Sequence, residues 1–290
     1  MLRSTNRPNA VLVCKAKRRN NSSYFLEQAL LARGVDIYRV TPDHIPAVDI
    51  SRVEYILNYG VSDPWVWESR IRWEPVVFNP QSLVEISANK LRTMRFLTEA
   101  GIPTLDYTTD RQVAEAWIAD GKRVFSRTVL GGRSGRGIVL SPPDPLPQAR
   151  LYTKSFGGKY AREYRVYIVN ERVVDLTEKR RLGKEQRLRK GLDHTDPYRG
   201  LIRAHDNGWV FARSNMIAST SVLEAVKELA RRTGECLHMG FGVVDIIARM
   251  NRTGELIEVR VVEPNTAPAM LDSPTTLARV TDALASTMGV

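Results

Sequence analysis

Apolar runs separated by an amphipathic segment mark the first part of the chain. Residues 10–14 (AVLVC) predict a buried strand, and the segment SSYFLEQALLARG predicts a helix with Ser22 or Ser23 as its N-cap and Gly34 as its stop. Three more apolar runs predict strands: VDIYRV, EYILNYG and VVFNP. Strands that alternate with helices are typical of a parallel α/β sheet, which we expect in this part of the chain.

Two helical segments and a glycine-rich loop follow. SANKLRTMRFLTEAGIP predicts one helix closed by Gly101 and Pro103, and DRQVAEAWIADG predicts another with Asp110 as its N-cap. The loop GGRSGRG (131–137) lies between two predicted strands. A P-loop or a Rossmann fingerprint needs a helix directly after its glycines, so this order argues against both. The loop could still cover a polyphosphate with backbone N–H groups and arginines; the alternative is a flexible hairpin.

The segment EYRVYIVNERVVDLTEK predicts two alternating strands joined by a turn at Asn170 and Glu171. Side chains two positions apart share a face of a strand, so one face of this pair carries charge. The residues expected on that face are Glu163, Arg165, Tyr167, Asp175, Thr177 and Lys179. This face could line a site, and the alternative is a sheet with one solvated face. Further on, Ser221 and Glu224 have capping-box spacing and predict the start of a helix.

The last two predicted strands carry acidic residues. Asp245 lies among apolar neighbours in FGVVDIIAR, where a carboxylate is costly unless it is paired or bound to a metal. Pro264 cannot donate a ladder hydrogen bond, so we expect regular pairing to fail there. Alternation predicts one row on the final strand: Val259, Val261, Glu263 and Asn265. Two carboxylates and an amide oxygen suit Mg²⁺; the alternatives are a salt bridge between Asp245 and an arginine, and a solvated Glu263.

Composition and charge narrow the classes of protein. The 290 residues are 43% hydrophobic and carry a formal net charge of +11, which favours anionic partners such as nucleotides, nucleic acid or acidic small molecules. No apolar run reaches the roughly 20 residues that span a bilayer, and the N-terminal apolar stretch is too short for a signal peptide. The two cysteines, Cys14 and Cys236, lack metal-site spacing. We therefore expect a cytoplasmic protein without a membrane partner.

In order and spacing, these segments resemble the ATP-grasp superfamily of carboxylate–amine ligases, and within it the RimK-like group with its phage-encoded relatives. The motifs that carry the resemblance are a helix ending GIP, RVFSRTVLGGRSGRGI, EYRVYIVNERVVDLTEKRR, GFGVVDII and VVEPNTAP. The resemblance implies a chain of α/β and α+β class with the ATP-grasp fold. A small α/β pre-ATP-grasp domain (1–85) would precede two α+β subdomains that grip ATP, a central one (86–154) and a C-terminal one with the metal site (155–290).

The resemblance also implies roles for individual residues. Asp245, Glu263 and Asn265 match the metal ligands, for Mg²⁺ with Mn²⁺ as the alternative. Arg127 lies where relatives have a phosphate-binding lysine, and it would act in catalysis together with Arg165 and Lys179. The residues implied to bind ATP are Lys90, Arg127, Gly132, Ser134, Gly135, Tyr152, Lys154 and Glu163.

Two positions depart from the family pattern. Pro264 stands inside the Glu-x-Asn motif, and Ala269 stands where related sequences have glycine. Neither departure removes a liganding group.

The activity implied is ATP-dependent formation of an amide or peptide-type bond through an acylphosphate, with ADP and phosphate as products. One alternative is a basic nucleic-acid-binding protein on a degenerate ATP-grasp scaffold. The metal-type acids and the lack of aromatic residues within the basic run argue against it. Another alternative is a kinase that stops at phosphoryl transfer.

The partners expected are a small-molecule or peptide carboxylate and an amine. The basic run 179–190 could contact an acidic or nucleic-acid acceptor, and the alternative is a solvated loop. By the resemblance, segment 202–215 could border the acceptor, with His205 as a weak candidate proton shuttle. Relatives commonly associate, which suggests a homo-oligomer, and a phage-encoded chain would act in the cytoplasm of its host.

Overall fold

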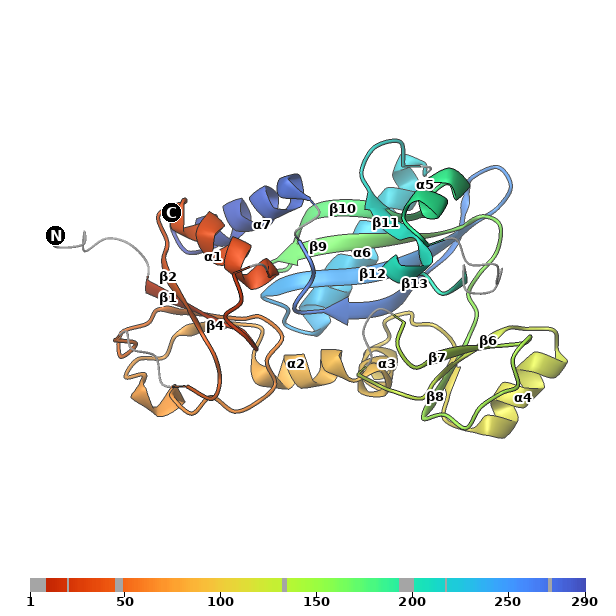
Figure 1. The fold of residues 1–290 in the computed structure, drawn as a ribbon, viewed down its shortest axis with the longest axis horizontal. Coiled ribbons are helices and arrows are strands. Elements are labelled where there is room, and N and C mark those ends of the chain that lie inside the picture. Colours follow the sequence, from red (N-terminus) through yellow and green to blue (C-terminus); the bar gives the residue numbers. More distant parts are fainter. Residues whose placement is uncertain are drawn as a thin grey trace.

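The computed structural model describes residues 9–19, 21–44, 49–131, 135–192, 201–216, 218–270 and 273–290. In this part of the chain the strands form three sheets, of four, four and five strands. Figure 1 shows the N-terminal sheet at one end, the long C-terminal sheet beside it, and the small central sheet at the other end. None of the helices described is long and apolar enough to span a bilayer.

The N-terminal sheet is parallel, with the strand order β2-β1-β3-β4. This confirms the α/β prediction for the first part of the chain. Helix α1 (Ser22–Leu31) begins one residue earlier than predicted, because Asn21 is its N-cap and accepts a hydrogen bond from the Tyr24 backbone N–H. The elements are β1 (Asn9–Val13), β2 (Asp36–Val40), β3 (Tyr55–Asn58), a 3₁₀ turn η1 (Glu68–Arg70) and β4 (Val76–Phe78).

The helix predicted over SANKLRTMRFLTEAGIP is α3 (Lys90–Glu99), and a helix that was not predicted, α2 (Gln81–Ala88), directly precedes it. Asn89 separates them. Its backbone is extended, and its side-chain oxygen accepts hydrogen bonds from the backbone N–H groups of Leu91 and Arg92. Asparagine competes with the helix for these donors, so it ends one helix and caps the next.

The central sheet has the order β5-β8-β6-β7 and is antiparallel throughout. Helix α4 (Arg111–Ala119) begins at the predicted cap Asp110, which accepts from the Gln112 backbone N–H. The helix packs through Ala114 and Trp117 on Val124 and Tyr152. The strands are β5 (Tyr107–Thr108), β6 (Val124–Arg127), β7 (Ile138–Ser141) and β8 (Leu151–Lys154).

The C-terminal sheet is antiparallel, with the order β11-β10-β9-β12-β13. Asn170 and Glu171 both have positive φ, 47° and 64°, as a two-residue hairpin turn requires, so the predicted hairpin is confirmed. Helix α6 begins earlier than predicted, with Ser219 as its cap. The strands are β9 (Ala161–Val169), β10 (Arg172–Arg181), β11 (Trp209–Ala212), β12 (Phe241–Met250) and β13 (Leu256–Asn265). The helices are α5 (Lys184–Arg189), η3 (His205–Asn207), α6 (Thr220–Cys236) and α7 (Pro274–Thr287).

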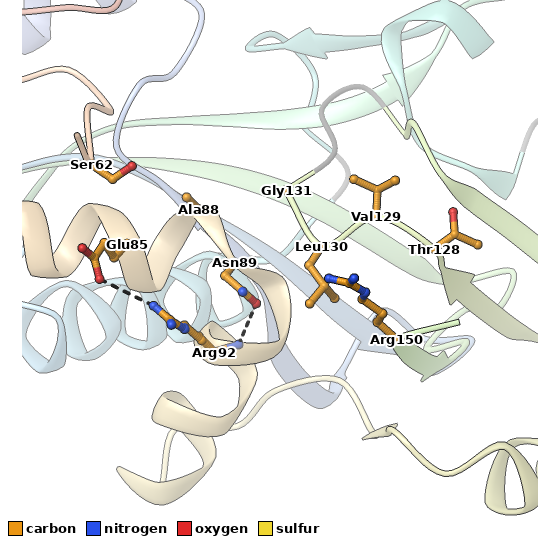
Figure 2. Close-up of a pocket in the computed structure, with 10 residues that line it drawn as sticks. All are labelled: Ser62, Glu85, Ala88, Asn89, Arg92, Thr128, Val129, Leu130, Gly131 and Arg150. Atoms are coloured by element: carbon orange, nitrogen blue, oxygen red, sulfur yellow. Dashed lines mark hydrogen bonds and ion pairs between the residues drawn. The ribbon is translucent and has the colours of Figure 1, made fainter. Parts of the chain in front are cut away.

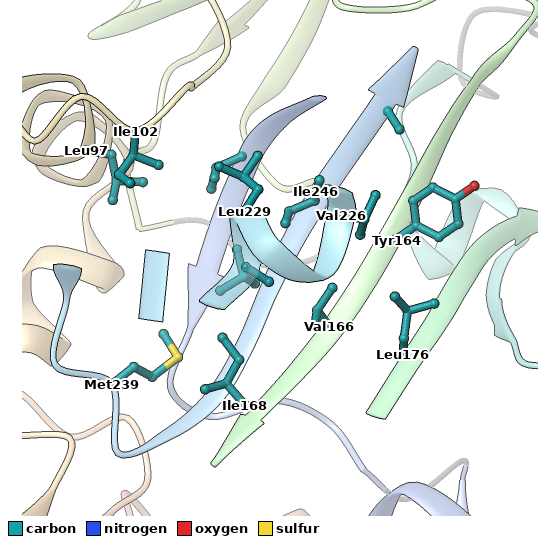
Figure 3. Close-up of a cluster of buried hydrophobic side chains, with 14 of the residues drawn as sticks. Leu97, Ile102, Tyr164, Val166, Ile168, Leu176, Val226, Leu229, Met239 and Ile246 are labelled. Carbon is teal, nitrogen blue, oxygen red and sulfur yellow. The ribbon is translucent and has the colours of Figure 1, made fainter. Parts of the chain in front are cut away.

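Helix α6 covers one face of the C-terminal sheet. Figure 3 shows Tyr164, Val166 and Ile168 of β9 in the same cluster as Val226 and Leu229 of the helix. The other face is covered at one end by helix α7, where Tyr167, Val169 and Val243 share a core with Val280 and Leu284. The remainder of this second face carries charged side chains, and we call it the charged face.

A β-bulge in β13 places these charges differently from the prediction. Asp245 pairs with Glu263, but Ile246 pairs with Val261, so Val262 is an extra residue. The bulge breaks the predicted row, because Val259 and Val261 face helix α6 whereas Glu263 and Asn265 share the opposite face with Asp245.

The pairing that we expected to fail at Pro264 continues through it. Pro264 pairs with Val244, and Asn265 pairs with Val243. The prediction was wrong because β13 is an edge strand, where a missing N–H need not leave a ladder bond unmade.

Candidate functional site

Strand register brings the charged residues together on one face of the C-terminal sheet. Residues that lie directly opposite each other on paired strands share a face, so each row below points the same way. The central row is Thr177, Arg165, Asp245 and Glu263, on β10, β9, β12 and β13. The rows on either side are Lys179, Glu163, Ile247 and Arg260, and Asp175, Tyr167, Val243 and Asn265.

Asp245 and Arg165 form a buried ion pair at the centre of this face. The two N–O distances, Nε to Oδ1 and Nη2 to Oδ2, are both 2.7 Å, and the Asp245 side chain is 2% exposed. Burial acts to lower the pKa of Arg165, but the charge and hydrogen bonds of Asp245 outweigh it and raise that pKa. The salt bridge that we considered for Asp245 is therefore present.

Glu163, on the adjacent row, interacts with two further cations, Lys179 and Arg203. Its Oε1 accepts a hydrogen bond from Lys179 Nζ at 2.8 Å, and Arg203 Nη1 lies 3.5 Å from Oε2. Burial acts to lower the pKa of Lys179, but Glu163 and Asp245 raise it overall. Lys179 is therefore a charged ammonium at neutral pH.

Glu263 forms an ion pair with Lys90, the first residue of helix α3. Burial acts to raise the pKa of Glu263, but the charge and hydrogen bond of Lys90 prevail, with help from Arg127 and Lys179. The resulting pKa is about 2, so Glu263 is ionised throughout the physiological range.

Arg127 reaches this face from strand β6 of the central sheet. Its Nε is buried and has no hydrogen-bond partner among the described residues. Burial lowers the pKa of Arg127, whereas Glu263 and Glu163 raise it, so the guanidinium lies within electrostatic range of both carboxylates. We call the seven residues gathered here the charged cluster: Lys90, Arg127, Glu163, Arg165, Lys179, Asp245 and Glu263.

The predicted metal ligands suit Mg²⁺ in donor type, and strand register puts them on one face of the sheet. Asp245 and Glu263 are paired directly, and the Asn265 amide oxygen, on the same face, accepts one hydrogen bond from the Ala267 backbone N–H at 2.8 Å. Carboxylate and amide oxygens are the ligands that this ion prefers. Within the described residues no group of three or more His, Cys, Asp or Glu could hold a metal, so an amide oxygen would complete such a site.

Tyr152 and Lys154 do not join the charged cluster through their side chains. Both lie on the face of the central sheet that packs on helix α4, whereas Arg127 lies on the opposite face. The Tyr152 hydroxyl donates to the Pro147 carbonyl at 3.0 Å. Lys154 pairs with Asp106 at 2.5 Å, and its Nζ lies 5.3 Å from the centre of the Trp117 ring. Tyr152 and Lys154 could therefore border a ligand in the cluster only through their backbone.

The glycine loop is described only in part. Gly132 and Ser134 lie outside the described residues. Gly135 has φ of 76°, and a Cβ at this position would lie 3.0 Å from Ile202 Cγ2. The described end of the loop therefore meets the segment that leads to Arg203, next to Glu163.

The sequence analysis named segment 202–215 as a possible border of the acceptor but did not single out Arg203 and Phe211, which lie beside the cluster. The Phe211 ring lies under Arg165, with 4.2 Å from the guanidinium carbon to the ring centre, and Lys179 Nζ lies 5.8 Å from it. Arg203 lies over Trp209 at 5.0 Å. The alternation in WVFA, which puts Trp209 and Phe211 on one face, was the available signal.

A pocket of about 640 Å³ lies beside the start of the glycine loop (Figure 2). The loop is tied to helix α3 there by a hydrogen bond from the Lys90 backbone N–H to the Leu130 carbonyl, 3.2 Å long. No residue of the charged cluster lines this pocket. Its lining is Ser62, Glu85, Ala88, Asn89, Arg92, Thr128, Val129, Leu130, Gly131 and Arg150.

Solved structures similar to this chain share one fold. No family model matches the sequence, and no curated protein matches it. The ATP-grasp ligase PsnB, complexed with a minimal precursor, Mg and ADP, has a TM-score of 0.64 at 14% identity over 98% of this chain and 99% of its own. A RimK domain ATP-grasp protein from Sphaerobacter thermophilus has a TM-score of 0.58 at 15% identity, with 96% and 98% coverage.

A third similar structure is the D-alanine–D-alanine ligase from Bacillus anthracis, with a TM-score of 0.61 at 14% identity and 97% coverage of both chains. The protein therefore has the ATP-grasp fold, with an N-terminal parallel sheet followed by two antiparallel sheets. At such low identity the fold alone is shown, and activity must be argued from the site.

Proposed function

We propose that the protein is an ATP-dependent carboxylate–amine ligase that works through an acylphosphate. The observation that carries this proposal is the meeting of Asp245 and Glu263, paired directly on one sheet, with Arg127 from another sheet, whose buried Nε has no partner among the described residues. Binding of Mg-ATP requires carboxylates that hold the metal ion and, beside them, a cationic side chain that donates hydrogen bonds to the phosphates. The similar PsnB structures, solved with Mg and ADP and with the peptide PsnA2 and AMPPNP, support the proposal.

The proposed reaction has two displacements. A carboxylate oxygen of the first substrate attacks the γ-phosphorus of ATP, and ADP leaves with the bridging electron pair. The nitrogen of the amine substrate then attacks the acyl carbon, phosphate leaves, and the amine loses a proton. Both steps depend on positioning and charge neutralisation, so no nucleophilic side chain is needed.

Each residue of the charged cluster has a place in this proposal. Asp245, Glu263 and Asn265 would hold Mg²⁺, which supplies neutralising charge to the phosphates when bound. Arg127 would donate to a phosphate oxygen from its Nε–H, which has no partner in the described part of the chain. Arg165 and Lys179 are fixed by Asp245 and Glu163 and would balance the charge of the transferred group.

The nucleotide would extend from the cluster along the central sheet. Lys90 and Glu163 would line its phosphate end, and Gly132, Ser134 and Gly135 of the glycine loop would lie over the phosphates. Tyr152 and Lys154 stay proposed for the adenine end, through the backbone of β8, because their side chains face helix α4.

The alternative of a nucleic-acid-binding protein is weakened by ion pairs that three cations of the basic run 179–190 form with acidic residues of the chain. Lys179 pairs with Glu163, Arg180 with Glu178, and Arg189 with Glu185. Cations already paired within the chain contribute less to phosphate contacts. The described residues therefore favour the ligase.

The experiment is to measure ADP release from Mg-ATP in the presence of pooled amino acids, polyamines, nucleotides and short acidic peptides. Wild type would be compared with Glu263→Gln and with Glu255→Gln, a control in the exposed turn between β12 and β13. ADP release by wild type and the control, lost in Glu263→Gln, supports the ligase. No release from any pool, together with no Mg-dependent nucleotide binding, would exclude it.

A further inference from the structure

Positive charge is concentrated near the start of the chain. Residues 1–26 contain six lysines and arginines and no acidic residue, so they supply more than half of the formal net charge of +11. Four of these cations lie in the segment that follows strand β1, residues 15–19, which we call the basic loop. All four are exposed, and among the described residues none forms an ion pair with a carboxylate: Lys15, Lys17, Arg18 and Arg19. The proposed ligase reaction gives this charge no role.

Neighbouring side chains hold the backbone of the basic loop. The Ala16 carbonyl accepts hydrogen bonds from Asn21 Nδ2 at 3.0 Å and from Cys14 Sγ at 3.6 Å. The Arg18 carbonyl accepts a hydrogen bond from Arg39 Nη1 at 2.9 Å. The loop is therefore held through its carbonyl groups, while its cationic side chains stay exposed. A surface that is ordered before it meets its partner loses less conformational entropy on binding.

Arg39 connects the basic loop with two aromatic side chains of helix α1. Its Nε lies 2.7 Å from Glu27 Oε2, and its guanidinium carbon lies 5.1 Å from the centre of the Tyr24 ring. The Phe25 ring meets the Tyr24 ring edge to face, with 5.3 Å between the ring centres. Phe25 is 40% exposed. These contacts place an exposed aromatic ring next to the basic loop.

Exposed cations beside an exposed aromatic ring are typical of surfaces that bind single-stranded nucleic acid. Lysine and arginine neutralise the backbone phosphates, and a base stacks on the ring. An acidic peptide would need the cations but not the ring. The basic run 179–190 contains no aromatic residue, so within the run only the first of these two features is present.

We propose that the basic loop and Phe25 form a surface that binds single-stranded nucleic acid. This partner is additional to the substrates of the proposed ligase, and no residue of the charged cluster takes part in binding it. The surface lies near the segment that follows Asn265, because Ser22 Oγ at the start of α1 accepts a hydrogen bond from the Met270 N–H at 3.3 Å. A bound strand would therefore lie next to the end of the proposed metal site.

The test is to measure, by fluorescence anisotropy, how the full chain binds labelled oligo(U) RNA and oligo(dT) DNA of about 12 nucleotides over a range of NaCl concentrations. The loop variant carries three substitutions: Lys17→Gln, Arg18→Gln and Arg19→Gln. The run variant, its control, loses the same charge from three exposed cations of the basic run: Lys184→Gln, Arg189→Gln and Lys190→Gln. The two variants together separate a specific surface from the general attraction of a basic protein.

We expect wild type and the run variant to bind the oligonucleotides alike, and the loop variant to bind them at least about tenfold more weakly at low salt. Each phosphate contact with a single strand contributes roughly 0.7 to the slope of log K against log salt concentration, so this slope should fall by about 2 in the loop variant. Equal binding by the two variants, or an unchanged slope, would overturn the proposal. A preference for one oligonucleotide would name RNA or DNA as the partner, and equal affinity would support a surface that recognises both.

Phe25→Leu separates stacking from charge. It should weaken oligonucleotide binding by at least about fivefold, the lower end of the contribution of one stacked base, without changing the salt slope. Trp73→Leu, which removes an exposed ring just before β4, is its control and should bind as wild type does. Urea unfolding of each variant should match wild type, because only exposed side chains are changed.

A peptide of about 12 glutamates tests the other class of anionic partner. At equal concentration it should not displace the oligonucleotide from wild type, because it offers no bases to stack on Phe25. Displacement by this peptide, or unchanged oligonucleotide binding in Phe25→Leu, would show a surface for anions in general and would overturn the nucleic-acid proposal.

Discussion

Asp245 lies directly opposite Glu263 on the charged face of the C-terminal sheet, because Val262 bulges from β13 just before Glu263. Without the bulge, Glu263 would lie on the face that packs against helix α6. Each acid is neutralised by a cation from elsewhere, Asp245 by Arg165 and Glu263 by Lys90. One extra residue in a strand thus assembles the site on which the proposed function depends.

Arg127→Met should weaken binding of Mg-ADP by about 1.5–3 kcal/mol, the usual contribution of a hydrogen bond to a charged group. The Nε of Arg127 has no partner among the described residues, so its removal should not lower the free energy of unfolding. Calorimetric titration and urea unfolding measure the two quantities. Arg123→Met, an exposed arginine just before the same strand, is the control. Equal nucleotide affinity in the two variants would show that Arg127 does not contact the phosphates.

Arg213→Met should destabilise the protein by about 3 kcal/mol at pH 7, because it leaves Asp175 buried with one arginine fewer. Burial acts to raise the pKa of Asp175, but Arg213 lowers it overall. A lowered pKa contributes stability above the unfolded value, near 4, and this contribution is lost as the pH falls through the folded pKa. The difference between wild type and variant should therefore shrink below about pH 4.

Urea unfolding at pH 7 and at lower pH measures this difference. Arg33→Met breaks an exposed pair with Asp282 and should cost less than about 1 kcal/mol at any pH. A cost for Arg213→Met that does not depend on pH would show that its ion pair with Asp175 is not the cause.

Much of the fold follows from sequence patterns. The elements that differ from their predictions differ for local reasons. The parallel N-terminal sheet, the hairpin at Asn170 and Glu171 and the Asp110 cap were predicted correctly, because each depends on neighbouring residues. The breaks and caps at Asn21, Asn89 and Ser219 were missed. Several nearby polar residues could have served in each case, and tertiary packing selects among them.

The arrangement of the site was predicted less completely than the fold, because the strand register that brings its residues together cannot be read from the sequence. Alternation cannot reveal a bulge, so the sequence placed Glu263 on the same face as Val261. Asp175 was expected on the charged face, but nothing local indicates its pairing with Arg213 and Arg279, which are 38 and 104 residues away. Such contacts depend on how distant elements pack.

Asn79→Gly should lower the free energy of unfolding by about 2–3 kcal/mol, at roughly 1 kcal/mol for each hydrogen bond lost. The buried Asn79 side chain joins the N-terminal and C-terminal sheets through three hydrogen bonds: it donates to the Phe241 carbonyl at 2.6 Å and the Asn58 carbonyl at 3.3 Å, and it accepts from the Phe241 N–H at 3.2 Å. Glycine tolerates its φ of 63°, so only the hydrogen bonds are removed.

Asn215→Gly is a matched control for Asn79→Gly, because Asn215 also has positive φ, 54°, but is exposed. It should change stability by less than about 0.5 kcal/mol. Urea unfolding of the two variants would give similar values if the side chain of Asn79 did not join the sheets.

The most direct test of the account is a calorimetric titration of ADP into wild type, Glu263→Gln and Glu255→Gln, each with and without Mg²⁺. Mg²⁺ should tighten ADP binding in wild type and in the exposed control. In Glu263→Gln we expect this tightening to fall by at least about tenfold, because one anionic ligand is lost. Mg²⁺-dependent binding that is absent from wild type, or unchanged in Glu263→Gln, would contradict a nucleotide and metal site at the charged cluster.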